Sequence, residues 1–198
     1  MVESYMVTPL RDMPANCWVF LGLLALLLFG YHVRAYWLAK KSGERCGILQ
    51  YIKENKIYIL GTMLVLYLGV VLCLTVLGRN RDETVTSELI PLWSWKDAFI
   101  KISENGDYGM LWQIFINILM FVPIGAMMYG IQRKKFCRTI LWCAGFSLTV
   151  EVLQLLFRVG LFEWDDIIHN TLGYLLGAGV VCVTGNLLKN IKIDRHDG

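Results

Sequence analysis

The stretch LFEWDDIIHNTLGYLLG, residues 161–177, joins a short acidic turn to the beginning of a long apolar segment. Two adjacent aspartates, Asp165 and Asp166, stand directly before residues that otherwise resemble a helix buried in a lipid bilayer. Charged side chains are costly in hydrocarbon, so acids at the beginning of such a helix are expected either to cap it or to serve a function. The stretch therefore predicts a membrane protein with a polar site near one membrane face.

The composition of the whole chain agrees with this prediction, because 56% of its 198 residues are hydrophobic and only 18% are charged. A helix needs about 20 mostly apolar residues to cross about 30 Å of hydrocarbon. Five runs meet this requirement: residues 17–39, 57–78, 111–130, 137–157 and 166–184. We expect an all-α, polytopic bundle of five transmembrane helices that forms a single membrane domain over residues 1–198. Its expected parts are two N-terminal spans in 17–78, a connection at 79–110 and a core of three spans in 111–184.

Lysine and arginine residues favour a topology with the N-terminus outside and the C-terminus in the cytoplasm, since short cytoplasmic connections collect positive charge. They gather after the first, third and fifth spans: Lys40, Lys41, Arg45, Lys53, Lys56, Arg133, Lys134, Lys135, Arg138, Lys189, Lys192 and Arg195. The connection 79–110 and the turn 158–165 then lie outside, and the segment around 88–100 is expected to be re-entrant, as a partial lid. The topology explains the net charge of +3, which gives no indication of nucleic-acid binding.

Polar side chains of the last three spans are expected to meet in one layer that opens to the outer face. Asn117 lies about 10 Å below the beginning of its span at about 1.5 Å per residue, Glu151 is about as deep, and Asn170 is somewhat shallower. Each belongs to a stripe of polar or small residues at helical spacing. The stripes are Gln113 and Asn117; Ser147, Glu151, Gln154 and Arg158; and Asp166, Asn170, Gly173 and Gly177. The glycines permit close approach of a neighbouring helix, and Pro123 permits a kink or break in the third span.

The same residues have structural interpretations. Glu151 could tie helices together through Asn117 and Asn170. One of the two aspartates suffices as an N-cap, and His169 either pairs with Asp165, four residues before it, or is incidental. The sequence has no cluster of His or Cys residues, so a divalent cation held by carboxylate and amide oxygens would be Mg²⁺ or Ca²⁺.

Three segments resemble, in order and spacing, the signatures of VanZ-like membrane proteins: NILMFVPIG at 117–125, SLTVEVLQ at 147–154 and GLFEWDDIIHNTLGYLLG at 160–177. The segment ELIPLWSW at 88–95 is similar to a proline-containing segment that usually precedes them. The family typically has asparagine where this chain has Glu88, and aspartate is common where it has Glu163. The resemblance implies a functional set of Asn117, Pro123, Gly125, Glu151, Gln154, Asp166, Asn170 and Gly173.

The resemblance also implies a multi-pass protein of the bacterial plasma membrane with an accessory role in resistance to glycopeptide antibiotics, teicoplanin in particular. Antibiotics of that class act outside the membrane on lipid-linked cell-wall precursor and can carry a lipid tail. The expected partners are therefore membrane lipids, such a precursor or a lipoglycopeptide.

Three functions stay open at this point. In the first, Glu151 is a general acid or base, while Asp165 or Asp166 polarises a water molecule or holds the cation. Arg158 would then bind a phosphate or carboxylate, and the substrate would be oriented by Asn117, Gln154, His169 and Asn170. In the second, the same layer binds a lipid headgroup or another amphiphile without chemistry. In the third, the protein is a small transporter, although no inverted repeat is visible.

Overall fold

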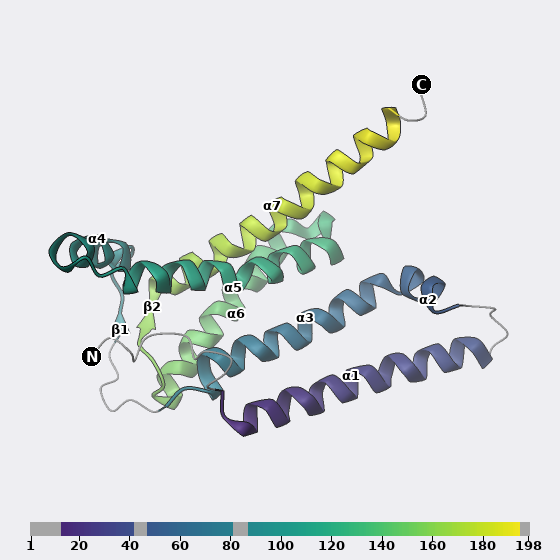
Figure 1. The fold of residues 1–198 in the computed structure, drawn as a ribbon, viewed down its shortest axis with the longest axis horizontal. Helices are drawn as coiled ribbons and strands as arrows, with labels where there is room; N and C mark the ends of the chain where they lie inside the picture. Colours follow the sequence, from purple (N-terminus) through teal and green to yellow (C-terminus); the bar gives the residue numbers. More distant parts are fainter. Residues whose placement is uncertain (1–12, 42–46, 81–86, 195–198) are drawn as a thin grey trace.

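The computed structural model describes residues 13–41, 47–80 and 87–194, with side chains as far as residue 186. In this part of the chain five helices are long and apolar enough to cross a membrane (Figure 1). They are α1 (Ala15–Lys41), α3 (Lys56–Leu72) with its π-helical extension η3 (Cys73–Leu77), α5 (Gly109–Ile131), α6 (Phe136–Phe157) and α7 (Trp164–Asp194). The all-α bundle of five spans is thus confirmed, and the chain is a multi-pass membrane protein.

Helix limits agree with the expected spans to within two residues, except at the C-terminal end of α7. The fifth span was expected to end at residue 184, whereas α7 continues to Asp194. Hydropathy locates the part of a helix that lies in hydrocarbon, and a helix can continue beyond it. The structure describes no side chain beyond residue 186, so the position of Lys189, Lys192 and Arg195 relative to the membrane stays a prediction.

Shorter elements lie between the long helices: α2 (Ile48–Glu54), β1 (Ser87–Glu88), α4 (Trp93–Asn105), η4 (Arg133–Lys135) and β2 (Phe162–Glu163). β1 and β2 pair in parallel, with Ser87 opposite Phe162 and Glu88 opposite Glu163. The segment 88–100, expected as a re-entrant lid, contains part of β1, a turn and the first half of α4, which packs against α5. A pair of two-residue strands has no periodicity that the sequence could reveal.

The alternating direction of the long helices gives the molecule two ends. At one end, here called the acidic end, lie η3, β1, α4, β2 and the beginning of α7 (Figure 1). At the other, here called the basic end, lie α2, η4 and the connection from α5 to α6. The sequence predicts that the acidic end faces the cell exterior.

α5 and α7 form the closest helix pair, and glycines make this approach possible. A Cβ atom on Gly173 would lie 2.0 Å from the Ile118 carbonyl oxygen, and one on Gly177 would lie 1.9 Å from that of Val122. From the other helix, a Cβ atom on Gly125 would lie 2.0 Å from the Tyr174 carbonyl oxygen. The two backbones therefore touch, as the small-residue spacing predicts.

α5 continues through Pro123 without a break. Around Pro123 a buried apolar cluster, which includes Phe121, Ile124 and Tyr174, joins α5 and α7 to α3 and α6. At the acidic end a second cluster of Val76, Val150 and Val159 joins η3 to α6 and the turn after it. These contacts hold five elements around a common point, where the polar residues gather.

Candidate functional site

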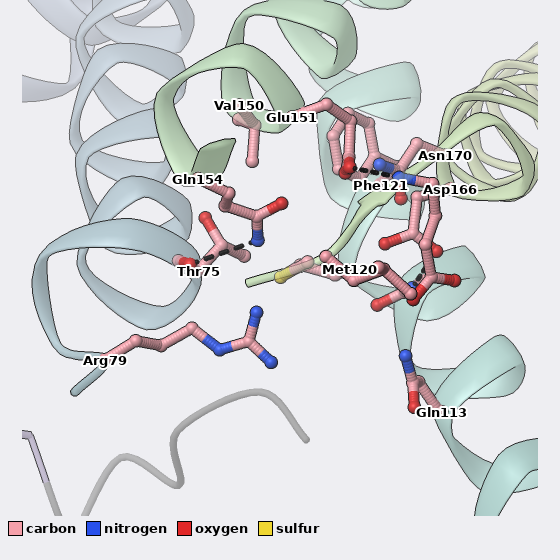
Figure 2. Close-up of a pocket in the computed structure, with 13 residues that line it drawn as sticks. Thr75, Arg79, Gln113, Met120, Phe121, Val150, Glu151, Gln154, Asp166 and Asn170 are labelled. Atoms are coloured by element: carbon pink, nitrogen blue, oxygen red, sulfur yellow. Dashed lines mark hydrogen bonds between the residues drawn. The ribbon is translucent and has the colours of Figure 1, made fainter. Parts of the chain in front are cut away.

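Polar side chains from η3, α5, α6, β2 and α7 surround a small cavity at the acidic end, here called the acidic pocket (Figure 2). Its lining consists of Thr75, Arg79, Gln113, Asn117, Met120, Phe121, Val150, Glu151, Gln154, Leu161, Glu163, Asp166 and Asn170. The cavity has a volume of about 20 Å³, which is room for about one water molecule. Five of the predicted site residues meet here: Asn117, Glu151, Gln154, Asp166 and Asn170.

Glu151 is buried in α6 and holds the beginning of the next element. Only 1% of its surface is exposed, and its Oε2 accepts a hydrogen bond of 2.9 Å from the backbone N–H of Glu163. Glu163 itself is 4% exposed and also lines the pocket. Two carboxyl groups twelve residues apart are thus brought into one cavity by the turn between α6 and α7.

Asp166 is the third carboxyl group of the pocket, and Asn117 fixes its position. The Asn117 Nδ2 donates a hydrogen bond of 2.7 Å to Asp166 Oδ1. An N–H donor stabilises the charged form of a carboxylate and orients it. This bond connects α5 with α7 at the level where the sequence predicts the polar layer.

His169 lies behind Asp166 and outside the pocket lining. Its Nε2 accepts a hydrogen bond of 2.9 Å from Trp95 Nε1, and the two rings pack edge to face with centroids 5.8 Å apart. Because an indole N–H can only donate, Nε2 carries no proton and the ring's proton is assigned to Nδ1. Nδ1 lies 3.8 Å from Asp166 Oδ1. The sequence left open whether His169 pairs with Asp165 or is incidental, and the structure turns it toward Trp95 and Asp166.

Two buried amide oxygens line the pocket without a hydrogen-bond partner among the described residues, namely Gln154 Oε1 and Asn170 Oδ1. The amide nitrogens are occupied: Asn170 Nδ2 donates to Ser147 Oγ at 2.8 Å, and Gln154 Nε2 donates to the Thr75 carbonyl at 3.1 Å. Thr75 lies in the last turn of its helix, where carbonyls lack intrahelical partners. A buried acceptor without a donor costs free energy. A bound group with N–H or O–H donors would satisfy both oxygens.

Arg79 is a pocket residue that the sequence did not reveal. It follows η3, and its guanidinium extends toward the acids from the side opposite Asp166 (Figure 2). Gly160 makes room for it, since a Cβ atom there would lie 2.8 Å from Arg79 Nη1. Burial lowers the pKa of Arg79, and the nearby carboxyl groups, Asp166 first, oppose this effect. An arginine keeps its charge in such surroundings.

Glu163 retains a proton near neutral pH. The pKa of this carboxyl group is raised to about 8, first by burial and then by the charges of Asp166 and Asp165. The guanidinium of Arg79 acts in the opposite direction. The pocket therefore contains a protonated carboxylic acid close to charged groups of both signs.

Comparison with known proteins shows the family of the chain. The family model described as VanZ/LLP1 matches residues 64–186. The chain belongs to the VanZ/LLP1 family. Protein VanZ of Enterococcus faecium is 21% identical over 108 residues, which cover 54% of this chain and 67% of that protein. No solved structure matches the chain.

Every residue that lines the acidic pocket lies within the VanZ/LLP1 match, whereas α1 and α2 lie before it. The match begins in the middle of α3 and includes η3 and Arg79. The match thus includes the end of the second span, which contributes Thr75 to the pocket, and the core of three spans at 111–184 stays a prediction.

Besides His169, two predicted site residues of this VanZ-family chain lie outside the pocket lining. Asp165 is fully buried, but its carboxylate binds the beginning of α4: it accepts hydrogen bonds from the Leu92 N–H, from the Ser94 N–H at 2.9 Å and from Ser94 Oγ at 2.5 Å. It thus caps α4 rather than its own helix. Arg158 is exposed and adopts a left-handed conformation with φ 55°. α6 ends at Phe157, so the helical spacing that placed Arg158 in the stripe no longer applies, and Arg79 provides the pocket's cation instead.

The divalent cation held by carboxylate and amide oxygens stays a prediction. Among residues 13–41, 47–80 and 87–194, no three His, Cys, Asp or Glu side chains converge in a metal-binding group. The three carboxyl groups of the pocket share the guanidinium of Arg79 as a nearby positive charge.

Gly125, Gly173 and Gly177, which the sequence assigned a structural role, shape the α5–α7 contact that brings Asn117 next to Asp166.

Proposed function

We propose that this VanZ-family protein contributes to resistance against glycopeptide antibiotics of the teicoplanin type. The proposed activity is acid–base chemistry in the acidic pocket on an outer-leaflet lipid or a cell-wall component. Membership of the family supports the link to resistance. The observation that carries the chemical part is that three carboxyl groups and one guanidinium enclose a cavity of about 20 Å³.

The proposed roles follow from the environment of each group. Glu163, whose pKa is raised to about 8, is protonated at pH 7 and is the proposed general acid. Glu151, held in place by the Glu163 N–H, is the proposed second proton-transfer group, as general acid or base. Asp166, oriented by Asn117, would polarise a water molecule in the cavity.

Arg79 and the two unpaired amide oxygens are the proposed substrate contacts. A guanidinium binds phosphate and carboxylate groups through paired N–H donors. Gln154 Oε1 and Asn170 Oδ1 would accept hydrogen bonds from hydroxyl or amide groups of the substrate. The cavity as it stands admits only a water-sized group, so a larger headgroup would reach the carboxyl groups only if lining side chains move.

A second candidate, lipid binding without chemistry, is favoured by an apolar hollow between α4 and α5. The hollow has a volume of about 330 Å³ and is lined by Trp95, Leu111, Trp112, Ile114, Phe115 and Ile118. It lies next to the pocket because Trp95 also binds His169, which faces Asp166. An acyl chain in this hollow would place its headgroup near the carboxyl groups. Transport gains no such support, since α5 passes Pro123 unbroken.

The decisive experiment uses Glu151→Gln, Asp166→Asn and Arg79→Gln in cells that depend on this protein for teicoplanin resistance. Membrane levels of each variant are matched by immunoblot, and resistance and envelope lipids are measured together. Removing a general acid or base typically costs about 10²–10⁴-fold in rate, so resistance should fall to that of cells without the protein. Arg158→Gln is the matched control, because it removes a neighbouring arginine that lies outside the pocket lining.

The lipid profile separates the two candidates. Loss of resistance together with loss of a modified lipid supports chemistry. Loss of resistance with an unchanged lipid profile supports binding alone. If the three pocket variants remain as resistant as Arg158→Gln, the pocket has no part in resistance and the proposal is wrong.

A further inference from the structure

The basic end contains an apolar crevice between α3, α5 and α6. Its volume is about 450 Å³. Each helix contributes two apolar side chains to its walls: Leu64 and Leu68, Ile124 and Met128, and Trp142 and Phe146. Near the acidic end η3 and α6 are joined through Val76 and Val150, and α3 separates from α6 toward the basic end (Figure 1). The crevice is thus a consequence of the helix directions.

A second hollow adjoins this crevice and is basic. It has a volume of about 720 Å³ and shares Gln132 and Lys135 with the crevice. The two hollows together are lined by five cationic side chains, Lys56, Arg133, Lys134, Lys135 and Arg138, and neither has an Asp or Glu in its lining. The five cations thus surround the adjoining hollow and the neighbouring part of the crevice.

This combination specifies an amphiphile with a negative headgroup. A free phosphate ion would gain nothing from the apolar walls, and an uncharged lipid would gain nothing from the cations. Anionic phospholipids are concentrated in the cytoplasmic leaflet, which is where the positive charge of these connections places the basic end. Each Lys or Arg near such a surface adds about fivefold to the affinity for anionic lipid.

We propose that the basic end binds one anionic phospholipid, with its phosphate against Lys135 and Arg138 and an acyl chain in the crevice. Lys135 and Arg138 are the two cations that line the crevice itself, so they lie where headgroup and chain would meet. The site is separate from the acidic pocket and does not depend on the function proposed for that pocket.

Native mass spectrometry of the purified full chain in neutral detergent tests this site, with phosphatidylglycerol and phosphatidylcholine of identical acyl chains as probes. The protein should retain phosphatidylglycerol at least tenfold more strongly than phosphatidylcholine. The double variant Lys135→Gln/Arg138→Gln should lose tenfold or more of that affinity. Lys41→Gln/Lys53→Gln, which removes two exposed cations from the same end, is the matched control and should stay within about twofold.

Two further measurements distinguish a bound phospholipid from other ligands. Leu64→Trp fills the crevice while keeping every charge, and it should reduce phosphatidylglycerol binding as well. Excess inorganic phosphate should not displace the lipid. Equal loss of affinity in both double variants would show attraction to positive charge in general and would overturn the proposal, as would full binding by Leu64→Trp or displacement by phosphate.

Discussion

The acidic end of this VanZ-family protein encloses charged side chains in a pocket, whereas the basic end leaves its cations exposed. At the acidic end three carboxyl groups and a guanidinium surround a cavity of about 20 Å³, and backbone and side-chain donors orient two of the carboxyl groups. At the basic end exposed cations border hollows of about 450 and 720 Å³. A buried charge needs particular partners at particular distances. A charge in water is solvated, so only the combined attraction of several such charges has a large effect. A single substitution should therefore change stability or activity at the acidic end, whereas at the basic end only combined substitutions should change binding.

The largest effect is expected where α5 and α7 touch. Gly173→Ala places a Cβ atom 2.0 Å from the Ile118 carbonyl oxygen, so the helices must separate. We expect a loss of about 3 kcal/mol, or a thermal midpoint lower by roughly 6–12 °C in detergent. Gly179→Ala on the same helix, where a Cβ atom meets open space, should change stability by less than about 0.5 kcal/mol. Equal midpoints for both variants would refute the backbone contact.

The next effect concerns the cap that joins α7 to α4. Asp165→Ala leaves the N–H groups of Leu92 and Ser94 without their acceptor, which should cost about 2 kcal/mol. The thermal midpoint and the tryptophan emission of Trp95 should both change. Asp97→Ala removes an acid of α4 that is only paired with Lys101 on the surface, so it should cost at most about 0.5 kcal/mol. If Asp97→Ala is the more damaging of the two, Asp165 is not the cap of α4.

A smaller effect is expected from the proton on Glu163. Its pKa is raised from 4.5 to about 8, so the folded state holds a proton that the unfolded state releases between these values. The resulting stability is complete below pH 4.5 and decreases as pH rises toward 8, by at most about 1.4 kcal/mol per pH unit. Thermal midpoints measured from pH 5 to pH 8.5 should decline in the wild type and decline less in Glu163→Gln. The exposed Glu104→Gln should keep the wild-type slope, and a wild-type midpoint that rises over this range would contradict the protonated state.

The smallest effect on stability is expected at Gly160. Gly160→Ala places a Cβ atom 2.8 Å from Arg79 Nη1, and the flexible arginine can move away at a cost of less than about 0.5 kcal/mol. Teicoplanin resistance should nevertheless fall, because the cation leaves its place among the carboxyl groups. Gly145→Ala on α6, which meets nothing within 4 Å, should leave both stability and resistance unchanged. Unchanged resistance in Gly160→Ala would show that the position of Arg79 does not matter for activity.

Much of the fold was predictable because it depends on local properties of the chain. Hydropathy locates spans, and helical spacing places Asn117, Glu151 and Asn170 at one level, where the structure brings them around one pocket. The spacing of Gly173 and Gly177 likewise predicts the close approach of α5. These inferences need only the geometry of a helix and the thickness of a bilayer.

The remaining features depend on partners that are distant in sequence. Asp165 binds backbone N–H groups more than 70 residues earlier, and β1 pairs with a strand that follows it by four helices. Arg79 reaches the pocket from outside the three last spans, so no stripe contains it. Arg158 was assigned by continuing a helical pattern one residue beyond the point where α6 ends. Only the folded backbone decides which of the two arginines joins the acids.

The π-helix η3 sets the rotational phase of whatever follows the second span. A π-turn holds more residues per turn than the α-helix from which it continues, so deletion of one residue within Cys73–Leu77 would restore α-helical pairing. Everything beyond the deletion would then turn by about 100° around the helix axis, while the span would shorten by only about 1.5 Å. Membrane insertion would tolerate so small a change, but Arg79 would no longer aim at the carboxyl groups. The register of the backbone, as well as the presence of an arginine, therefore specifies the cation of the pocket.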